Sequence, residues 1–170
     1  MNIKHLLVLF FIVFIQACES NKNTGEFAPY QMVNARAPSP NLVTAGQPSL
    51  EDFDRLAKRG VKVVINLRTK KEMKNSNERE QVEKRGMTYI SIPIDGSDGI
   101  TLANVKKLDA AMNNLKQPVL VHCASSNRVG GLLAYRAYIL QHKAAQEALS
   151  FGRSAGMKST EKKVKKLLAL

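Results

Sequence analysis

Short β-branched segments alternate with amphipathic helical patterns along this chain, and the alternation restricts the fold more than any other feature. The segments that predict strands are residues 61–67, 87–94 and 119–122. Helical patterns precede, separate and follow them, over residues 49–59, 76–85, 101–115, 128–143, 144–151 and 160–168. Strands separated by helices predict an α/β three-layer sandwich with a central, largely parallel sheet.

The ends of the three predicted strands carry polar residues suited to a binding site. Arg68 follows the first strand, Asp95 and Asp98 follow the second, and Cys123 follows the third. Ligands of parallel sheets bind beyond the carboxyl ends of the strands. We therefore expect these residues to converge at one edge of the sheet.

The segment after the third strand has the composition of an oxyanion site. His122 and Cys123 are followed by the loop Ala124, Ser125, Ser126 and Asn127, and Arg128 then begins a helix. Loop amides and a helix N-terminus offer hydrogen-bond donors and positive dipole to an anion, and they favour a thiolate. A planar guanidinium can hold two phosphate oxygens at once. Cys123 is therefore a candidate nucleophile directed at an anion that the loop has captured.

Four motifs resemble those of the cysteine-dependent phosphatase family typified by the phosphatase-like domain of beta-lactamase-hydrolase-like proteins. They lie at residues 44–52, 64–68, 92–94 and 122–130. The resemblance implies a tyrosine or dual-specificity phosphatase-like fold without a cofactor. It also implies hydrolysis of phosphate monoesters, either protein phosphotyrosine or small molecules, through a phosphocysteine at Cys123. Arg128 would clamp the phosphate, and His122 would orient the loop and favour the thiolate.

Three departures from the general phosphatase pattern keep other functions open. Four residues separate Cys123 from Arg128 where that pattern has five, and four is the length found in rhodanese-like sulfurtransferases. Ser126 stands where glycine is usual, which strains the backbone if the position requires a positive φ. Val129 replaces the hydroxyl residue that assists departure of the cysteine. The alternatives are a sulfurtransferase that uses Cys123 and a non-catalytic anion-binding lipoprotein.

The supporting residues each have a structural alternative. Either Asp95 or Asp98 could be the general acid that protonates the leaving oxygen, or both could be turn residues. Arg68 could be a second anion contact or a strand-end ion pair. The three histidines are dispersed and the predicted domain has one thiol, so the sequence predicts no metal site.

The N-terminus has the pattern of a bacterial lipoprotein signal. Residues 6–15 are ten consecutive apolar residues, too few for a helix that crosses a bilayer about 30 Å thick. Residues 15–18 resemble a lipobox, which implies acylation of Cys18, for example with palmitate. We expect a signal peptide at 1–17, a lipidated tether at 18–27 and one phosphatase-like domain at 28–170. The protein would be exported and anchored in the bacterial cell envelope, at the outer membrane facing the periplasm.

The charge balance is strongly basic. The chain has 26 Lys and Arg against 14 Asp and Glu, for a net charge of +12. Part of this excess lies near the C-terminus, in Arg153, Lys158, Lys162, Lys163, Lys165 and Lys166. This basic C-terminal helix could contact an anionic surface or could be an ordinary solvated face. An exported location, few aromatic residues and no nucleic-acid motif argue against a nucleic-acid partner.

Overall fold

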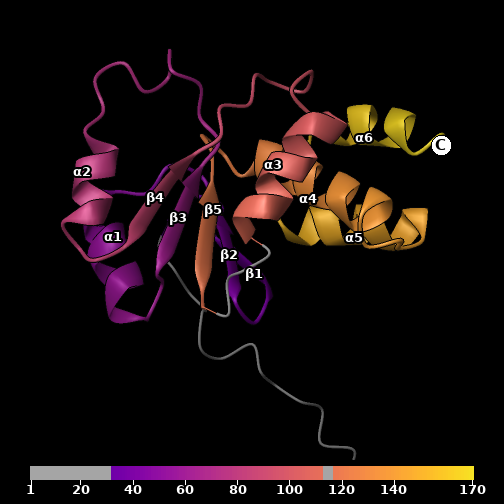
Figure 1. Cartoon of the computed structure of the whole chain (residues 1–170). Helices are drawn as coiled ribbons and strands as arrows, with labels where there is room; N and C mark the ends of the chain where they lie inside the picture. Colours follow the sequence, from indigo (N-terminus) through magenta and orange to yellow (C-terminus); the bar gives the residue numbers. More distant parts are fainter. Residues whose placement is uncertain (1–31, 113–116) are drawn as a thin grey trace, which may run out of the picture.

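A five-stranded sheet forms the centre of the computed structural model, which describes residues 32–112 and 117–170 (Figure 1). The strand order is β1-β2-β5-β3-β4, and every neighbouring pair is parallel except β1 with β2. The strands are β1 (Arg36–Ser39), β2 (Leu42–Ala45), β3 (Val63–Asn66), β4 (Thr88–Ser91) and β5 (Val119–His122). The predicted parallel sheet is therefore confirmed, and β1 adds one antiparallel edge.

Strands β1 and β2 were not expected from the sequence. Each has four residues, and β1 contains Pro38, which cannot donate to a strand ladder and is tolerated at an edge. β2 is fully buried because it pairs with both β1 and β5. This pairing places Ala45 beside His122, so the end of β2 meets the segment that carries Cys123.

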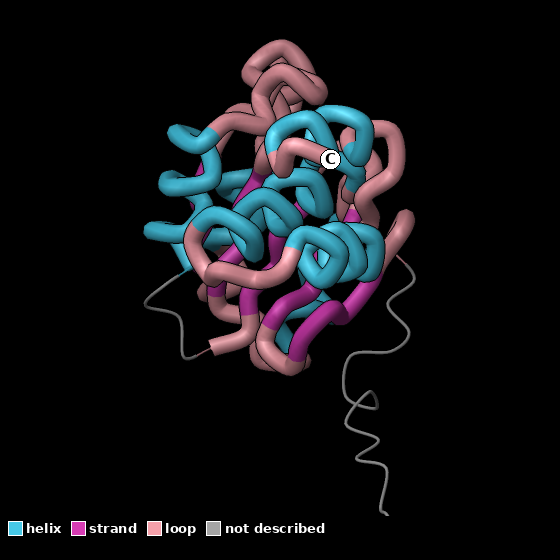
Figure 2. The backbone as a smooth tube through the Cα atoms, turned by 90° about the vertical axis from the view of Figure 1, so that its right-hand side faces the viewer, coloured by secondary structure: helices cyan, strands magenta, loops and turns pink. Residues whose placement is uncertain are grey.

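Helices cover both faces of the sheet, as Figures 1 and 2 show. α1 and α2 lie on one face, and α3 to α6 lie on the other. The helices are α1 (Leu50–Lys58), α2 (Glu78–Glu83), α3 (Leu102–Met112), α4 (Asn127–Ile139), α5 (Ala145–Ser154) and α6 (Glu161–Leu167). Two apolar cores result, one on each face of the sheet, and the predicted three-layer sandwich is confirmed.

The start of α1 follows the capping pattern of its sequence, with one difference. The Asp52 amide donates to Ser49 Oγ at 3.2 Å, and the Ser49 amide donates to Asp52 Oδ2 at 2.8 Å. Leu50, an apolar residue within the predicted helix 49–59, is half exposed. Asp52 is buried in the same turn because the reciprocal cap draws its carboxyl group inward.

The expected signal peptide, the lipidation site at Cys18 and the tether at 18–27 lie outside the described residues. Within the described ranges, no helix combines the length and the apolar composition needed to cross a membrane.

Candidate active site

The predicted oxyanion loop leaves β5 directly and ends where α4 begins. The Cys123 amide is fixed by a hydrogen bond to the Ala45 carbonyl at 3.3 Å, which ties the loop to β2. Ser125 forms an isolated β-bridge with Gly46, and the Gln47 amide donates to the Ala124 carbonyl at 3.2 Å, so the loop also pairs with the segment after β2. Backbone amides ahead of a helix N-terminus can bind an anion.

Arg128 lies at the first turn of α4 and is held in a defined orientation. Its Nη1 donates to Glu72 Oε2 at 2.8 Å and its Nη2 donates to Glu72 Oε1 at 2.6 Å. Nη1 also donates to the Ile94 carbonyl at 2.8 Å. These contacts involve the two terminal nitrogens, Nη1 and Nη2. Because Glu72 follows β3 and Ile94 follows β4, the loops after these two strands orient the guanidinium.

Glu72 is a site residue that the sequence analysis missed. Its Oε2 accepts from the Thr69 amide at 2.8 Å and from Thr69 Oγ1 at 2.9 Å. The hydrogen bonds from Arg128, followed by those from Thr69, lower the pKa of Glu72 to about 2 despite partial burial. Its signal in the sequence was slight, an acidic residue four positions after Arg68 in a loop that also carries several lysines.

Cys123 lies beneath this arrangement. Its side chain is fully buried. The pKa of Arg128 is raised, first by its hydrogen bonds to Glu72 and further by the charge and hydrogen bond of Cys123. The predicted nucleophile therefore lies near enough to the predicted anion clamp to influence its pKa.

His122 belongs to a buried polar network on the opposite side of the strand. Its Nε2 lies 2.9 Å from Oε1 of Glu78, a residue that is almost fully buried at the start of α2. Asn66 Nδ2 and Gln47 Nε2 each donate to the Glu78 carboxylate at 2.6 Å. Burial favours protonation of Glu78, but its hydrogen bonds and the charge of His122 outweigh this and lower its pKa. The carboxylate thus fixes the imidazole that precedes the nucleophile.

Glu78 and Gln47 had no functional assignment from the sequence, where Gln47 fitted a turn before a helix. One signal was available in Asn66, a polar residue at the end of an otherwise apolar strand segment. A buried polar side chain requires a hydrogen-bond partner. The sequence alone gave no indication of which residue that partner would be.

Arg68 links this network to the neighbouring loop, and within residues 32–112 and 117–170 it forms no strand-end ion pair, which was one expectation for it. Its side chain donates to Gln47 Oε1 and to the Glu72 carbonyl, which are uncharged acceptors. Its amide donates to Asn66 Oδ1 at 2.7 Å. Arg68 therefore connects the Glu78 network with the loop that carries Glu72.

The loops after β3, β4 and β5 line one hollow of about 540 Å³, but of the residues expected to converge there, Arg68 and Cys123 are not among its lining residues. Its walls come from the loops after β3 and β4, from the Cys123 loop and from the turn between α5 and α6. Asp95 lines the hollow together with Arg128. Asp98 is almost fully exposed and lies 3.8 Å from Lys163 on α6. Of the two candidate acids, the structure brings only Asp95 to the hollow.

The α5–α6 turn supports the oxyanion loop and uses two side chains that the sequence assigned to phosphate. Ser126 has a φ of 67°, in the region that favours glycine, as was considered for this position. Its Oγ donates to the Ala155 carbonyl at 2.9 Å. Asn127 Oδ1 accepts from the Lys158 amide at 2.7 Å, and its Nδ2 donates to Ser159 Oγ at 2.7 Å. The expected phosphate-binding role of Ser126 and Asn127 therefore reduces to their backbone amides.

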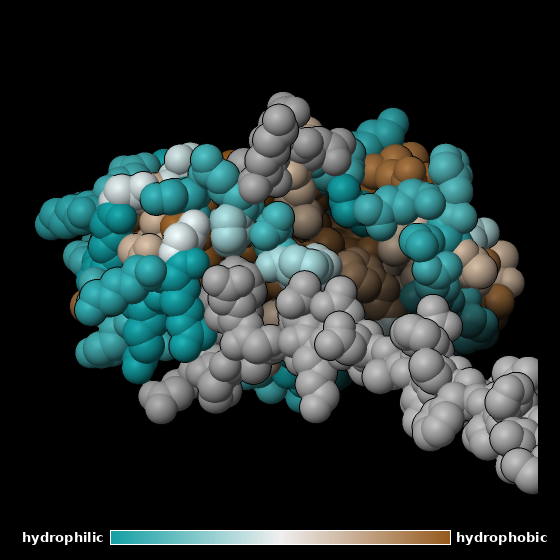
Figure 3. All heavy atoms as spheres, turned by 90° about the horizontal axis from the view of Figure 1, so that it is seen from below, coloured by the Kyte–Doolittle hydropathy of each residue, from teal (hydrophilic) through white to brown (hydrophobic). Residues whose placement is uncertain are grey.

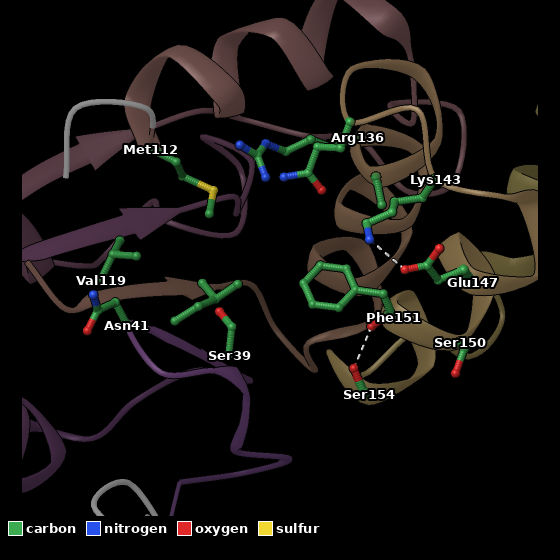
Figure 4. A pocket seen from close by; sticks show the side chains of 13 residues that line it. Ser39, Asn41, Met112, Val119, Arg136, Lys143, Glu147, Ser150, Phe151 and Ser154 are labelled. Atoms are coloured by element: carbon green, nitrogen blue, oxygen red, sulfur yellow. Dashed lines mark hydrogen bonds and ion pairs between the residues drawn. The ribbon is translucent and has the colours of Figure 1, made fainter. Parts of the chain in front are cut away.

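A second hollow, of about 610 Å³, lies near the opposite ends of β2 and β5 (Figures 3 and 4). The Phe151 ring points into it, and Lys143 pairs with Glu147 at its edge at 2.7 Å. Figure 3 shows apolar atoms between hydrophilic margins on this face. None of the candidate residues from the sequence lies there.

The described residues offer no evident set of metal ligands. No group of three or more His, Cys, Asp or Glu side chains there could hold an ion. The groups that line the first hollow include the guanidinium of Arg128 and the carboxyl groups of Glu72 and Asp95, and the buried thiol of Cys123 lies at the start of the loop that forms one wall.

Sequence comparison assigns the chain to a family. A model described as DSP-PTPase phosphatase fused to NAD+ kinase matches residues 25–168. The chain belongs to this family. The chain is also similar to the beta-lactamase hydrolase-like protein of Xylella fastidiosa, with 33% identity over 119 residues. That alignment covers 68% of the chain but only 27% of the relative.

Solved structures show the same fold. A phosphatase-like protein (DUF442) from Shewanella putrefaciens superposes with a TM-score of 0.63 at 25% identity, over 82% of this chain and 93% of that one. TpbA of P. aeruginosa, solved in complex with pTyr, gives a TM-score of 0.57 at 21% identity, over 78% and 81%. The phosphatase-like fold that the motifs implied is therefore confirmed.

Proposed function

We propose that this DSP-PTPase family member is a cysteine-dependent phosphatase that hydrolyses phosphate monoesters through a phosphocysteine. The observation that carries the proposal is the placement of Cys123 directly after β5 and of Arg128 at the start of α4, at the two ends of one loop beside the hollow that Arg128 lines. A thiolate there would face a phosphate held by the loop amides and the guanidinium. The family membership and the pTyr complex of the TpbA neighbour support a phosphorylated substrate.

The reaction would proceed in two steps. The Cys123 thiolate attacks phosphorus, the P–O bond to the leaving group breaks, and Asp95 gives its proton to the departing oxygen. Water then attacks the phosphorus of the phosphocysteine while Asp95 takes a proton from that water. Inorganic phosphate leaves and the thiolate is restored. Val129 is buried in α4, whereas Ser125 is exposed in the loop, so Ser125 is the hydroxyl placed to assist the second step.

The test is hydrolysis of 4-nitrophenyl phosphate by the purified protein and its variants. Cys123→Ser should abolish turnover, and Arg128→Ala should reduce it at least about a hundredfold. Cys18→Ser is the matched control, because it removes the other cysteine and should leave turnover unchanged. Equal activity in the wild type and Cys123→Ser would refute the proposal.

A sulfurtransferase is a second candidate because only four residues separate Cys123 from Arg128. The same proteins can be assayed for transfer of sulfur from thiosulfate to cyanide. Transfer with a persulfide on Cys123, without phosphate release, would favour this function. Binding of tungstate by calorimetry without either turnover would indicate the third alternative, a non-catalytic anion-binding lipoprotein.

We also propose that the protein is exported and anchored by acylation of Cys18, in the cell envelope facing the periplasm. The support is the apolar segment 6–15 followed by the lipobox-like residues 15–18. Labelled palmitate should be incorporated into the wild type and not into Cys18→Ser. Recovery of the wild type in the soluble fraction, without label, would contradict the anchor.

A further inference from the structure

The residues that line the Arg128 hollow are polar, although their carbon atoms also contribute to its surface. Each described residue that lines it is charged, hydroxyl-bearing, an amide or glycine, and none has an aromatic or aliphatic side chain. Small-molecule sites are usually lined mainly by apolar and aromatic side chains, with a few polar groups that fix orientation. The composition of this hollow is therefore unusual for a small-molecule site. It determines which chemical class of leaving group the hollow can accommodate.

Several polar groups of these walls have no partner within the protein. The hydroxyls of Ser97 and Ser125 and the ammonium of Lys71 make no hydrogen bond or ion pair with the described residues. Ser159 Oγ accepts from Asn127, which leaves its own O–H proton free to donate. Ser97, Lys71 and Ser159 come from three different loops, so donors without a protein partner lie on several walls of the hollow that Arg128 also lines.

A phenyl ring would be a poor fit to these walls. Burying it would strip water from hydroxyl and ammonium groups and return no hydrogen bond, which is unfavourable. A group rich in hydroxyls would replace that water with hydrogen bonds. The volume of about 540 Å³ exceeds what a phosphate alone needs and leaves room for a sugar-sized group.

We propose that the natural substrate is the phosphate monoester of a polyol, such as a sugar or inositol, and not phosphotyrosine. This inference rests on the proposed phosphatase function and specifies its substrate class. The polyol could be a free small molecule or the headgroup of a lipid, since the recognised chemistry is the same. The walls discriminate by their unpaired donors, because a site built to hydrogen-bond a ligand rejects one that cannot do so.

Binding to the Cys123→Ser variant separates recognition from chemistry. Calorimetry would compare inositol 1-phosphate, glucose 6-phosphate, phosphotyrosine and inorganic phosphate. Vesicles of phosphatidylcholine with and without phosphatidylinositol 4-phosphate would test the lipid source. We expect a polyol phosphate to bind at least about tenfold more tightly than phosphotyrosine. Tighter binding of phosphotyrosine would overturn the inference.

Two substitutions make the test specific to the walls. Ser159→Ala should weaken binding of the polyol phosphate by about three- to tenfold, more than it weakens that of phosphotyrosine. Ser97→Tyr would supply an aromatic wall and should shift the preference toward phosphotyrosine. Ser154→Ala is the matched control, an exposed serine on α5 outside this hollow. An unchanged preference in both wall variants would contradict the proposed contacts.

Turnover of the same panel by the wild type distinguishes this inference from the proposed function. Hydrolysis that prefers phosphotyrosine would agree with the proposed phosphatase function and refute the inference of a polyol phosphate substrate. Selective binding of polyol phosphates without hydrolysis would support recognition of polyols by the walls of the hollow and would refute the proposed phosphatase function. Failure to bind any phosphate ester would refute both.

Discussion

Arg128 and Glu72 form a two-pronged ion pair, with Nη1 to Oε2 at 2.8 Å and Nη2 to Oε1 at 2.6 Å. The pair joins the start of α4 to the loop after β3, residues that are 56 positions apart in the sequence. It fixes the guanidinium plane, so the orientation of the anion clamp depends on a carboxylate that does not itself bind the anion.

We expect Arg128→Lys to be nearly as damaging as loss of the side chain. Lysine keeps the charge but lacks the planar fork that meets Glu72 and a phosphate together. Aryl phosphate kcat/KM should fall by about a hundredfold or more. Arg153→Lys is the matched control, because Arg153 makes the same type of pair with Glu161 away from the hollow. Comparable losses in both variants would contradict a special role for Arg128.

The Glu72 pair should make stability depend on acid pH. The pKa of Glu72 is lowered from 4.5 to about 2 in the fold, so the pair stabilises the native state above pH 4.5 and this contribution is lost as pH falls toward 2. Urea unfolding between pH 6 and 2 should show a loss of about 1–3 kcal/mol attributable to this group, after allowance for solvent screening. Glu72→Gln should be less stable at pH 6 and flatter across that interval; a parallel pH dependence would refute the assignment.

Glu78→Gln should disturb both stability and the pH profile of activity. The neutral amide would present a donor to Asn66, Gln47 and His122, which now donate to or pair with the carboxylate. Leaving buried donors unmatched costs about 1–3 kcal/mol, measurable by denaturant unfolding. The pH dependence of kcat/KM should also change because the substitution removes a buried carboxylate whose pKa is lowered in the fold and which holds His122 in place. Glu80→Gln, two residues along on the exposed side of α2, should alter neither.

Asp95→Asn and Asp98→Asn should differ in effect. Asp95 lines the hollow and Asp98 faces solvent near Lys163. A general acid matters most for a poor leaving group, so Asp95→Asn should lower kcat for alkyl phosphates by about a hundredfold and less for 4-nitrophenyl phosphate. Asp98→Asn should change both little. A larger effect from Asp98 would reassign the acid.

Gly130→Ala should be strongly destabilising. A Cβ at Gly130 would lie 2.1 Å from the Met157 amide nitrogen and 2.6 Å from the Gly152 carbonyl oxygen, both of them backbone atoms. Separating α4 from the α5–α6 turn would cost about 3 kcal/mol or more. Gly60→Ala provides the comparison, since its space is open and only its φ of +82° opposes the change, at a cost of about 1 kcal/mol. Thermal unfolding would rank the two variants, and a smaller loss for Gly130→Ala would contradict this packing.

Local patterns were sufficient for most elements of the fold. The periodicity around Val105 and Leu108 predicted α3, and the capping pattern of Ser49 and Asp52 predicted the start of α1. β1 and β2 escaped because four residues hold too little periodicity, and because β1 is stabilised only by pairing with β2. Both strands are defined by their pairing in the sheet, β1 with β2 and β2 also with β5, and this pairing leaves no local pattern in the sequence.

The sequence by itself determined the order along the chain of β3, β4, β5 and the helices, the position of Cys123 after a buried strand and the arginine at the start of the next helix. These follow from hydrophobic periodicity and from residue types within one short segment. Only the tertiary structure decided that Glu72 orients Arg128, that Glu78 fixes His122, and that Asp95 rather than Asp98 faces the hollow. Such pairs depend on the three-dimensional meeting of loops separated by tens of residues, and acidic residues on a loop look alike in sequence until the sheet brings one of them to a cation.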